Sequence, residues 1–490
     1  MAAVIGRDSE KAELDRALVS GQPELIAVYG RRRVGKTFLI REYLANAICF
    51  ELTGLHNETL PRQLENFSRR LREQTGADEP VPQSWLEAFG QLRGFLSNQR
   101  SKQKRVLFFD EFPWLAGRRS GFLSAFEEFW NSFASRDSGI VCIICGSAAS
   151  WMITKVINAK GGLHNRATAT LRLEPFTLAE TKEYLQHRRV SLTDLQITQL
   201  YTVLGGIPHY LQRVKRGQSA AQTIDELCFT KDGLLAREFD NLYAALFENA
   251  DRHESVVRVL ADTRQGLTRT ELVRSASLES GGTLTKVLRE LSESGFIREM
   301  PALHAVRKNS LLRLTDEYSL FYLKWIETNR MSGADVWLTK SSGQKYKSWC
   351  GYAFENLCLK HVPQIKAALG ISGVLTEEAS WHYRAADDSQ QGAQIDLLID
   401  RNDQCINVCE MKFSEAPFTI DKRYAAELRR KLAVFRERSK TNKSIFLTMV
   451  TSAGLRQNQY SRELVAGEVT LADLFEPLKR QKSQSAVRSE

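Results

Sequence analysis

The 490-residue sequence contains no long apolar run, and no stretch reaches the roughly 20 apolar residues that a membrane-spanning helix needs. It also lacks a secretory signal, because its start, Met1–Asp8, has neither a basic segment nor an extended apolar core. Internal repeats and low-complexity tracts are missing as well. These absences predict a cytoplasmic protein without a membrane partner.

Paired cysteines are scarce. The eight cysteines are scattered and lie mostly within apolar runs, which is typical of buried, reduced thiols. Cys142 and Cys145 have the spacing of a zinc-ligand pair, but no second pair and no histidine lies near them in the sequence. Buried thiols are therefore the favoured interpretation, and a zinc site is the less favoured one.

The composition is otherwise ordinary for a globular protein, with 43% hydrophobic and 26% charged residues. The length predicts about three domains. The formal net charge of +10 favours a polyanionic partner such as nucleic acid, with DNA preferred. Many soluble proteins are equally basic without such a partner, so the charge alone does not decide the question.

The most informative stretch is a buried-strand run, Leu25–Tyr29, followed at once by G-x-x-x-x-G-K-T at residues 30–37. Residues 38–44 then have the pattern of a helix. Strand, glycine-rich loop and helix in this order are typical of the phosphate-binding loop of P-loop NTPases. The alternative is a glycine-rich turn with a solvated lysine, and the strand and helix on either side argue against it.

The loop residues have distinct expected roles in binding ATP and Mg²⁺. Gly30 and Gly35 allow the tight turn that points backbone N–H groups at phosphate oxygens. Lys36 is expected to reach the β- and γ-phosphates, and the Thr37 hydroxyl to hold Mg²⁺. Arg33 and Phe38 are further positions expected to contact the nucleotide.

Two more strands end in polar residues. Residues 105–109 form an apolar run that ends in Asp110 and Glu111, as the Walker B strand of such ATPases does. Asp110 is expected to accept from the water shell of Mg²⁺, and Glu111 to orient the attacking water. The third strand, 139–146, is followed by Ser147, which either senses the γ-phosphate or is an ordinary serine at a strand end.

The chain divides by its patterns into an α/β part, a helical part and a mixed part. Residues 1–175 alternate strands and helices, which predicts a parallel sheet. Residues 176–249 are predicted to form a helical lid. Residues 250–320 have the order helix, helix, turn, helix and hairpin, which predicts a winged helix.

The third helix of that module carries Lys286 and Arg289 on its outer side, where they suit phosphate contacts. A winged helix can equally serve as a structural joint. The remaining predicted parts are a connector at 321–345, a C-terminal domain at 346–476 and a flexible tail at 477–490.

A second group of reactive side chains lies in the C-terminal domain. Strands at 392–400 and 405–413 are joined by a polar turn and form a predicted hairpin. Glu410 and Lys412 are one residue apart, so they share a face of the second strand, and Asp396 lies on the first. These three side chains are therefore expected to converge.

This group suits phosphodiester hydrolysis. Asp396 and Glu410 are candidate Mg²⁺ ligands, Lys412 would stabilise the phosphate, and Glu355 on a preceding helix would add a fourth group. The alternative is a surface Glu–Lys pair beside an unrelated aspartate, since E-x-K is common in strands.

The combined pattern resembles a family of prokaryotic AAA+/STAND-like P-loop ATPases with a winged helix and a C-terminal nuclease-like domain of the PD-(D/E)xK superfamily. The resemblance covers nearly the whole chain, and the segments that carry it are Ile5–Glu10, Gly30–Thr37, Gly146–Ser147, Gly162–Arg166, Leu173–Phe176, Gly205–Pro208, Glu355, Asp396, Glu410 and Lys412. It implies an α/β multidomain fold, a sensor role for Ser147 and an arginine finger at Arg166 within a homo-oligomer. Asn165 departs from the family pattern, where a glycine is usual.

Two hypotheses follow. The first is an ATP-binding and ATP-hydrolysing enzyme that acts on nucleic acid and carries a Mg²⁺-dependent nuclease domain. The second is a nucleotide-switched DNA-binding regulator whose nuclease-like domain is inactive. An open cleft around Glu355, Asp396, Glu410 and Lys412 would favour the first hypothesis, and a filled cleft the second.

Overall fold

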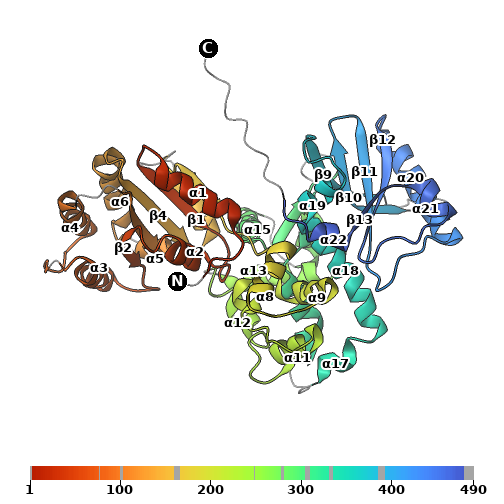
Figure 1. The fold of residues 1–490 in the computed structure, drawn as a ribbon, viewed down its shortest axis with the longest axis horizontal. Helices are drawn as coiled ribbons and strands as arrows, with labels where there is room; N and C mark the ends of the chain where they lie inside the picture. The colour runs from red at the N-terminus through yellow and green to blue at the C-terminus, as the bar shows by residue number, and fades with distance from the viewer. Residues whose placement is uncertain are drawn as a thin grey trace, which may run out of the picture.

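The computed structural model describes residues 3–76, 78–99, 103–117, 119–158, 166–247, 249–276, 281–303, 310–329, 335–383 and 392–478. Two five-stranded sheets lie toward opposite ends of the molecule, and a helical lid and a small three-helix module lie between them (Figure 1). The predicted tail residues 479–490 and the motif residues 162–165 fall outside the described residues.

The N-terminal sheet contains β1 (Glu24–Tyr29), β2 (Ile48–Thr53), β3 (Arg105–Asp110), β4 (Ile140–Gly146) and β5 (Ala169–Arg172). Its strands are all parallel, in the order β2-β3-β4-β1-β5. This confirms the predicted parallel α/β architecture. Because β4 lies between β1 and β3, the carboxyl ends of these three strands meet at one edge of the sheet.

Helices cover both faces of this sheet, and they are α1 (Asp8–Val19), α2 (Lys36–Tyr43), α3 (Leu60–Thr75), α4 (Trp85–Asn98), α5 (Phe112–Leu115), α6 (Phe122–Ser132) and α7 (Ala149–Met152). Successive residues of a strand enter different cores, as the strand period of two requires. Phe108 packs into one core and Phe109 into the other. Both faces are thus apolar, which explains the continuous hydrophobic runs in the sequence.

The lid consists of α8 (Leu178–His187), α9 (Asp194–Leu204), α10 (Pro208–Leu211), α11 (Ala220–Phe229) and α12 (Glu238–Leu242). Capping boxes at Thr177, Thr193 and Ser219 fix the starts of three of these helices. Helix α16 (Glu317–Phe321) ends where the predicted connector begins, and α17 (Val336–Lys340) lies within the connector. Trp337 of α17 stacks on Phe229 at 5.8 Å between ring centroids. This segment is therefore part of the lid core.

The three-helix module contains α13 (Ala250–Ala261), α14 (Arg269–Ser275) and α15 (Gly282–Glu293). Strands β6 (Leu267–Thr268), β7 (Ile297–Met300) and β8 (Leu311–Leu314) form an antiparallel sheet in the order β6-β8-β7. The three helices and the pair β7 and β8 follow in the order expected from the sequence, and β6, between α13 and α14, is an additional strand.

The C-terminal domain begins with α18 (Gln344–Lys360) and α19 (Val362–Ala368). Its sheet has the order β13-β12-β11-β10-β9 and contains β9 (Thr376–Tyr383), β10 (Ala393–Arg401), β11 (Cys405–Lys412), β12 (Ser444–Thr451) and β13 (Val465–Thr470). Three further helices are α20 (Lys422–Ser439), α21 (Gln459–Leu464) and α22 (Leu471–Leu474). The sheet is mixed: β9, β10 and β11 pair antiparallel, and β11, β12 and β13 pair parallel.

The antiparallel pairing of β10 with β11 confirms the predicted hairpin, and Leu397 lies opposite Cys409. No helix in the described part of the chain combines the length and the apolar character that crossing a bilayer requires.

Candidate functional site

The glycine-rich loop connects β1 directly to α2. Gly30 has a φ of 144°, and a Cβ at this position would lie 2.3 Å from the carbonyl oxygen of Leu173. A larger residue would therefore clash with the strand-end backbone. Gly35 has a φ of 91° and forms the N-cap of α2. The two glycines allow the turn that puts the N-terminus of α2, with its free N–H groups, at the edge of the sheet.

Lys36 lies almost fully buried at the centre of this edge, with 5% of its surface exposed. Its Nζ donates to the carbonyl oxygens of Gly30 and Arg31, both at 2.9 Å, and to Ser147 Oγ at 3.0 Å. Burial lowers the pKa of Lys36 below its ordinary value. The ammonium is thus held in a low-dielectric site where a phosphate group would be its strongest partner.

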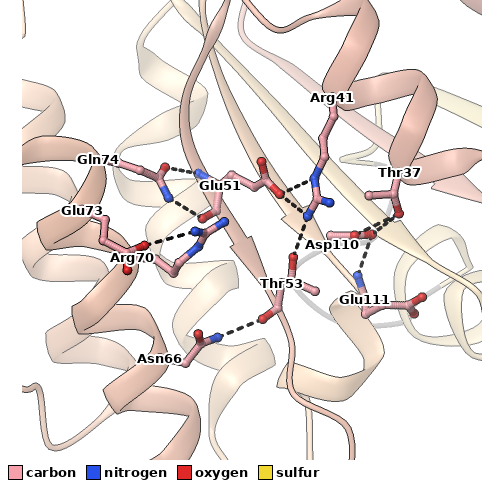
Figure 2. Close-up of polar contacts among 10 residues, drawn as sticks. All are labelled: Thr37, Arg41, Glu51, Thr53, Asn66, Arg70, Glu73, Gln74, Asp110 and Glu111. Atoms are coloured by element: carbon pink, nitrogen blue, oxygen red, sulfur yellow. Dashed lines mark hydrogen bonds and ion pairs between the residues drawn. The ribbon is translucent and has the colours of Figure 1, made fainter. Parts of the chain in front are cut away.

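Thr37, Asp110, Glu111 and Ser147 meet beside Lys36. The Thr37 hydroxyl donates to Asp110 Oδ2 at 2.9 Å, and the Glu111 N–H donates to Asp110 Oδ1 at 3.0 Å (Figure 2). The Ser147 hydroxyl donates to Glu111 Oε1 at 2.9 Å. The residue after β4, Ser147, therefore contacts the residue after β3, Glu111, because the two strands are neighbours in the sheet.

The same contacts allow a test of whether Mg²⁺ fits. The Thr37 hydroxyl and the Asp110 carboxylate are neighbouring oxygen donors, which is the ligand chemistry that Mg²⁺ prefers. Mg²⁺ typically keeps several waters and takes its other ligands from phosphates. The residues present fit a nucleotide-bound Mg²⁺ ion.

A cleft of about 640 Å³ extends from the loop toward the lid. Phe38 lines it with 47% of its surface exposed, which is unusual for a large apolar side chain. The other lining residues outside the glycine-rich loop include Val4, Ile5, Phe176, Tyr184, His187, Pro208 and His209. The cleft thus has a cationic end at Lys36 and an apolar end between the N-terminal segment and the lid.

The arginines around the loop have three different environments. Arg32 and Arg33 line the cleft, and Arg33 forms an ion pair with Glu238 of the lid. Arg31 points away from the cleft and forms a buried ion pair with Asp316. Arg7 donates to the carbonyl oxygen of Val34 at 3.0 Å.

Arg166 is exposed and is not among the residues that line the cleft. No described contact joins it to the loop of the same chain. Its predicted role as an arginine finger would therefore place it at the site of a neighbouring copy.

A second cleft, of about 690 Å³, lies between α7 and the three-helix module. Its cationic lining residues are Lys155, Arg252, Lys286 and Arg289, and its single lining carboxylate is Glu290. Lys286 and Arg289 keep 58% and 52% of their side-chain surface exposed. Each approaches a glutamate four residues further along α15 at 3.8 Å, so these pairs are weak and solvent-screened.

In the C-terminal group, Glu410 and Lys412 lie side by side on β11. Lys412 Nζ lies 3.0 Å from Glu410 Oε1. Glu410 also accepts hydrogen bonds from Lys431 at 2.6 Å and from the Tyr424 hydroxyl at 2.7 Å. Burial opposes ionisation of Glu410, but Lys412 and Lys431 hold its pKa below the ordinary value. This carboxylate is therefore fully engaged by side chains of β11 and α20.

Glu355 lies on the other side of the same group. Burial and the negative charge of Asp396 raise the pKa of Glu355 to about 7. Arg313 of β8 binds Glu355, with 3.2 Å between Nη2 and Oε2. Asp396 accepts from Gln394 at 2.7 Å, and a cavity of only about 20 Å³ lies between it and Arg313. Such a cavity holds roughly one water molecule.

In this arrangement the group does not fit a divalent metal. Two of the three carboxylates already have protein cations as partners, because Arg313 pairs with Glu355, and Lys412 and Lys431 pair with Glu410. Within the described ranges, no three His, Cys, Asp or Glu side chains gather closely enough to hold a metal ion.

Known proteins are similar to this chain in the region of the glycine-rich loop. Residues 5–214 match the sequence model of a family described as an ATPase domain predominantly from Archaea. The chain is an ATPase. Its ATPase domain includes the glycine-rich loop, Asp110, Glu111 and Ser147.

The ATPase also resembles an uncharacterized protein of Methanocaldococcus jannaschii. The two are 23% identical over 415 residues, which cover 84% of this chain and 88% of the relative. The similarity extends well beyond the ATPase domain. It gives no activity for the remaining domains.

Solved structures resemble this chain with low sequence identity and TM-scores below 0.5. A Walker-type ATPase of Pyrococcus abyssi is 17% identical with a TM-score of 0.46, and covers 66% of this chain and 96% of its own. The ORC2 protein of Aeropyrum pernix is 17% identical with a TM-score of 0.40, and covers 67% and 95%. TM-scores below 0.5 are too low to support a conclusion about function.

Several site residues of the ATPase escaped the sequence analysis. Arg313, Tyr424 and Lys431 contact the predicted C-terminal group but belong to other elements, and Asp316 contacts the loop from far along the chain. None of them lies in a recognisable motif. Only Lys431 carries a weak signal, as a basic residue on a helix that follows the hairpin directly.

Proposed function

We propose that the chain is a Mg²⁺-dependent ATPase that acts on nucleic acid and carries a nuclease-like C-terminal domain. The proposed domains are the ATPase core at 1–175, the lid at 176–249, a winged helix at 250–320, the connector at 321–345 and a PD-(D/E)xK-like domain at 346–476. The observation that carries the ATPase part is the convergence of Lys36, Thr37, Asp110, Glu111 and Ser147 in one cleft.

The roles in ATP hydrolysis follow from this convergence. Lys36 neutralises the β- and γ-phosphates, and the N–H groups at the start of α2 bind the phosphate oxygens. Mg²⁺ held by Thr37 and Asp110 would withdraw charge from the phosphate oxygens. Glu111 orients the attacking water, and Ser147, already bonded to Glu111, reports the position of the γ-phosphate.

The apolar end of the cleft is the proposed base site. Phe38 and Tyr184 offer aromatic surfaces, and Val4 and Ile5 offer aliphatic ones. Arg7 supports this end, because it ties the N-terminal segment to the loop through Val34. An adenine ring stacks on such surfaces without requiring further charge.

The proposed nucleic-acid surface is the cleft between α7 and α15. Four cations against one lining carboxylate give it a net positive charge, and the net charge of the whole chain is +10. The hairpin of the module is engaged elsewhere, since Arg298 of β7 binds Glu378 of the C-terminal sheet. The helix α15, and not the hairpin, is therefore the proposed contact.

This contact has a direct test. Affinity for duplex DNA should fall with salt, with a slope of about −0.9 per phosphate contact on a log–log plot. Lys286→Ala with Arg289→Ala should reduce that slope, and Lys231→Ala with Lys345→Ala, which remove two exposed lysines outside the cleft, should leave it unchanged. Absence of binding at low salt would remove DNA from the proposal.

The nuclease part is proposed on the convergence of Asp396, Glu410, Lys412 and Glu355. Asp396 and Glu410 would be the metal ligands in an arrangement in which Lys431 releases Glu410 and Arg313 releases Glu355, and Lys412 would turn from Glu410 to the phosphate. Asp396→Ala should then abolish both cleavage and metal binding while ATP hydrolysis persists. Lys412→Ala should abolish cleavage and keep most of the metal affinity, since lysine is no ligand here.

A specific observation favours the second candidate, a nucleotide-switched regulator with an inactive nuclease-like domain. Each of Glu355 and Glu410 already has a protein cation as its partner. Incubation with plasmid, linear and single-stranded DNA and with RNA, with Mg²⁺ or Mn²⁺ and with or without ATP, separates the two candidates. Cleavage that requires Asp396 supports the nuclease, and DNA binding without any cleavage supports the regulator.

A further inference from the structure

A seven-residue stretch, Leu311–Glu317, contacts both the ATPase loop and the C-terminal carboxylates. We call it the bridging segment. It contains three ionisable side chains, Arg313, Asp316 and Glu317, which are 3%, 1% and 3% exposed. Burying a charge is costly unless it is paired, so each of these groups depends on its partner for its position.

Toward the ATPase core, the partner is Arg31 of the glycine-rich loop. Arg31 forms a buried ion pair with Asp316, and its guanidinium lies 4.7 Å from the ring centroid of Phe296. Asp316 is itself fixed, because it accepts from Ser319 N at 2.9 Å and from Ser319 Oγ at 2.6 Å as the N-cap of α16. The loop and the start of α16 are therefore rigidly joined.

Toward the C-terminal domain, the partners lie on α18. Arg313 binds Glu355, and Lys360 donates to Glu317 Oε2 at 2.6 Å. The Arg313 guanidinium also lies 5.4 Å from the ring centroid of Tyr352. Contacts to three residues of one helix anchor the bridging segment to the domain that carries Asp396 and Glu410.

ATP binding acts directly on the loop end of this connection. Lys36 Nζ donates to the carbonyl oxygens of Gly30 and Arg31, and a bound phosphate competes for the same protons. The Arg31 backbone then loses a donor and adjusts, while its side chain stays bound to Asp316. A shift of the Arg31 backbone would therefore act on the bridging segment and, through it, on the contacts with α18.

We propose that the bridging segment couples ATP binding at the glycine-rich loop to the position of Arg313 over the C-terminal carboxylates. ATP binding draws the segment toward the core and withdraws Arg313 from Glu355. Linkage requires the reverse effect as well, so that loss of the Arg313–Glu355 contact strengthens ATP binding. The proposal concerns ATP affinity and backbone motion, and it stands or falls separately from any nuclease activity.

The first test is the ATP affinity of Glu355→Gln in the full chain. This change removes the charge that holds Arg313, and we expect ATP to bind at least fivefold more tightly, within the usual range of coupling between sites of about 5–150-fold. Glu378→Gln is the matched control, since it weakens the Arg298 contact between the same two domains outside the segment. Its ATP affinity should equal that of the parent.

The coupling should also vanish when the loop end is disconnected. Arg31→Met combined with Asp316→Asn removes both charges of the buried pair, and asparagine keeps the cap of α16. In that background Glu355→Gln should leave ATP affinity unchanged. Equal ATP affinity of the parent and the single Glu355→Gln variant would overturn the proposal.

A second measurement on the parent chain avoids any folding defect of a variant. Hydrogen exchange with a saturating non-hydrolysable ATP analogue should change in the bridging segment and in α18, and should stay constant in α20. Unaltered exchange in the bridging segment, with the analogue bound, would overturn the proposal even if the affinities behaved as expected.

Discussion

Replacing Glu111 by glutamine should separate ATP binding from ATP hydrolysis. Glu111 lies directly after β3, and its carboxylate accepts from the Ser147 hydroxyl at 2.9 Å. Glutamine has the same length and its amide oxygen still accepts this bond, so the cleft keeps its shape. The change removes the negative charge that polarises the attacking water, and it leaves Lys36 and Thr37 untouched.

The magnitude follows from the role of a single acid–base group. Loss of such a group slows turnover by about 10²–10⁴-fold, which corresponds to about 3–5 kcal/mol of activation free energy. ATP affinity should stay within about threefold of the parent, because the Lys36 contacts to phosphate remain. Phosphate release under single-turnover conditions and equilibrium titration with a fluorescent ATP analogue measure the two quantities.

A matched control makes the same substitution on β2, the strand next to β3 in the sheet. Glu51 on β2 pairs with Arg41 and lies outside the cleft (Figure 2). Glu51→Gln should hydrolyse ATP at nearly the parental rate. Turnover of Glu111→Gln within tenfold of the parent would refute the reasoning and would mean that another residue positions the water.

Three further predictions concern other groups. Lys36→Ala should lose measurable ATP binding in calorimetry while its circular dichroism spectrum stays native, and parental affinity would contradict the assigned site. Mixing Lys36→Ala with Arg166→Ala protein should restore turnover if Arg166 completes a neighbouring site, and no recovery after subunit exchange would indicate a site within one chain. Burial lowers the pKa of His361 from 6.5 to about 4. As the pH falls from 6.5 to 4, His361 therefore binds a proton in the unfolded chain but stays neutral in the folded chain. The free energy of unfolding should drop by up to about 3 kcal/mol in this window. Urea titrations of the parent and of His361→Asn should differ in this slope, whereas His56→Asn, at an exposed histidine, should behave like the parent.

The structure explains why the neutral form of His361 is favoured. Its Nε2 accepts from the Leu178 N–H at 3.1 Å, and its Nδ1 lies 2.8 Å from the Leu357 carbonyl oxygen. The ring therefore bridges the start of the lid helix α8 and the end of α18. A proton on Nε2 would break the contact to the lid.

The sequence by itself determined the features that contiguous residues encode. Continuous apolar runs marked β1, β3 and β4, because a parallel strand covered on both faces needs no polar side. The glycine pattern at 30–37 indicated the loop, since glycine adopts the positive φ angles that the tight turn at Gly30 and Gly35 requires. The alternation around Glu410 and Lys412 likewise fixed the shared face of the hairpin.

Only the tertiary structure decided which charges meet. Arg31 is one of three consecutive arginines, and nothing local distinguishes it from the two that line the cleft, yet its partner Asp316 lies 285 residues away. Arg313 and Lys431 reach the C-terminal carboxylates from two different elements and pair with Glu355 and Glu410. A buried charge takes its partner from whichever element packs against it, and that packing is set by the whole core and not by any short run of residues.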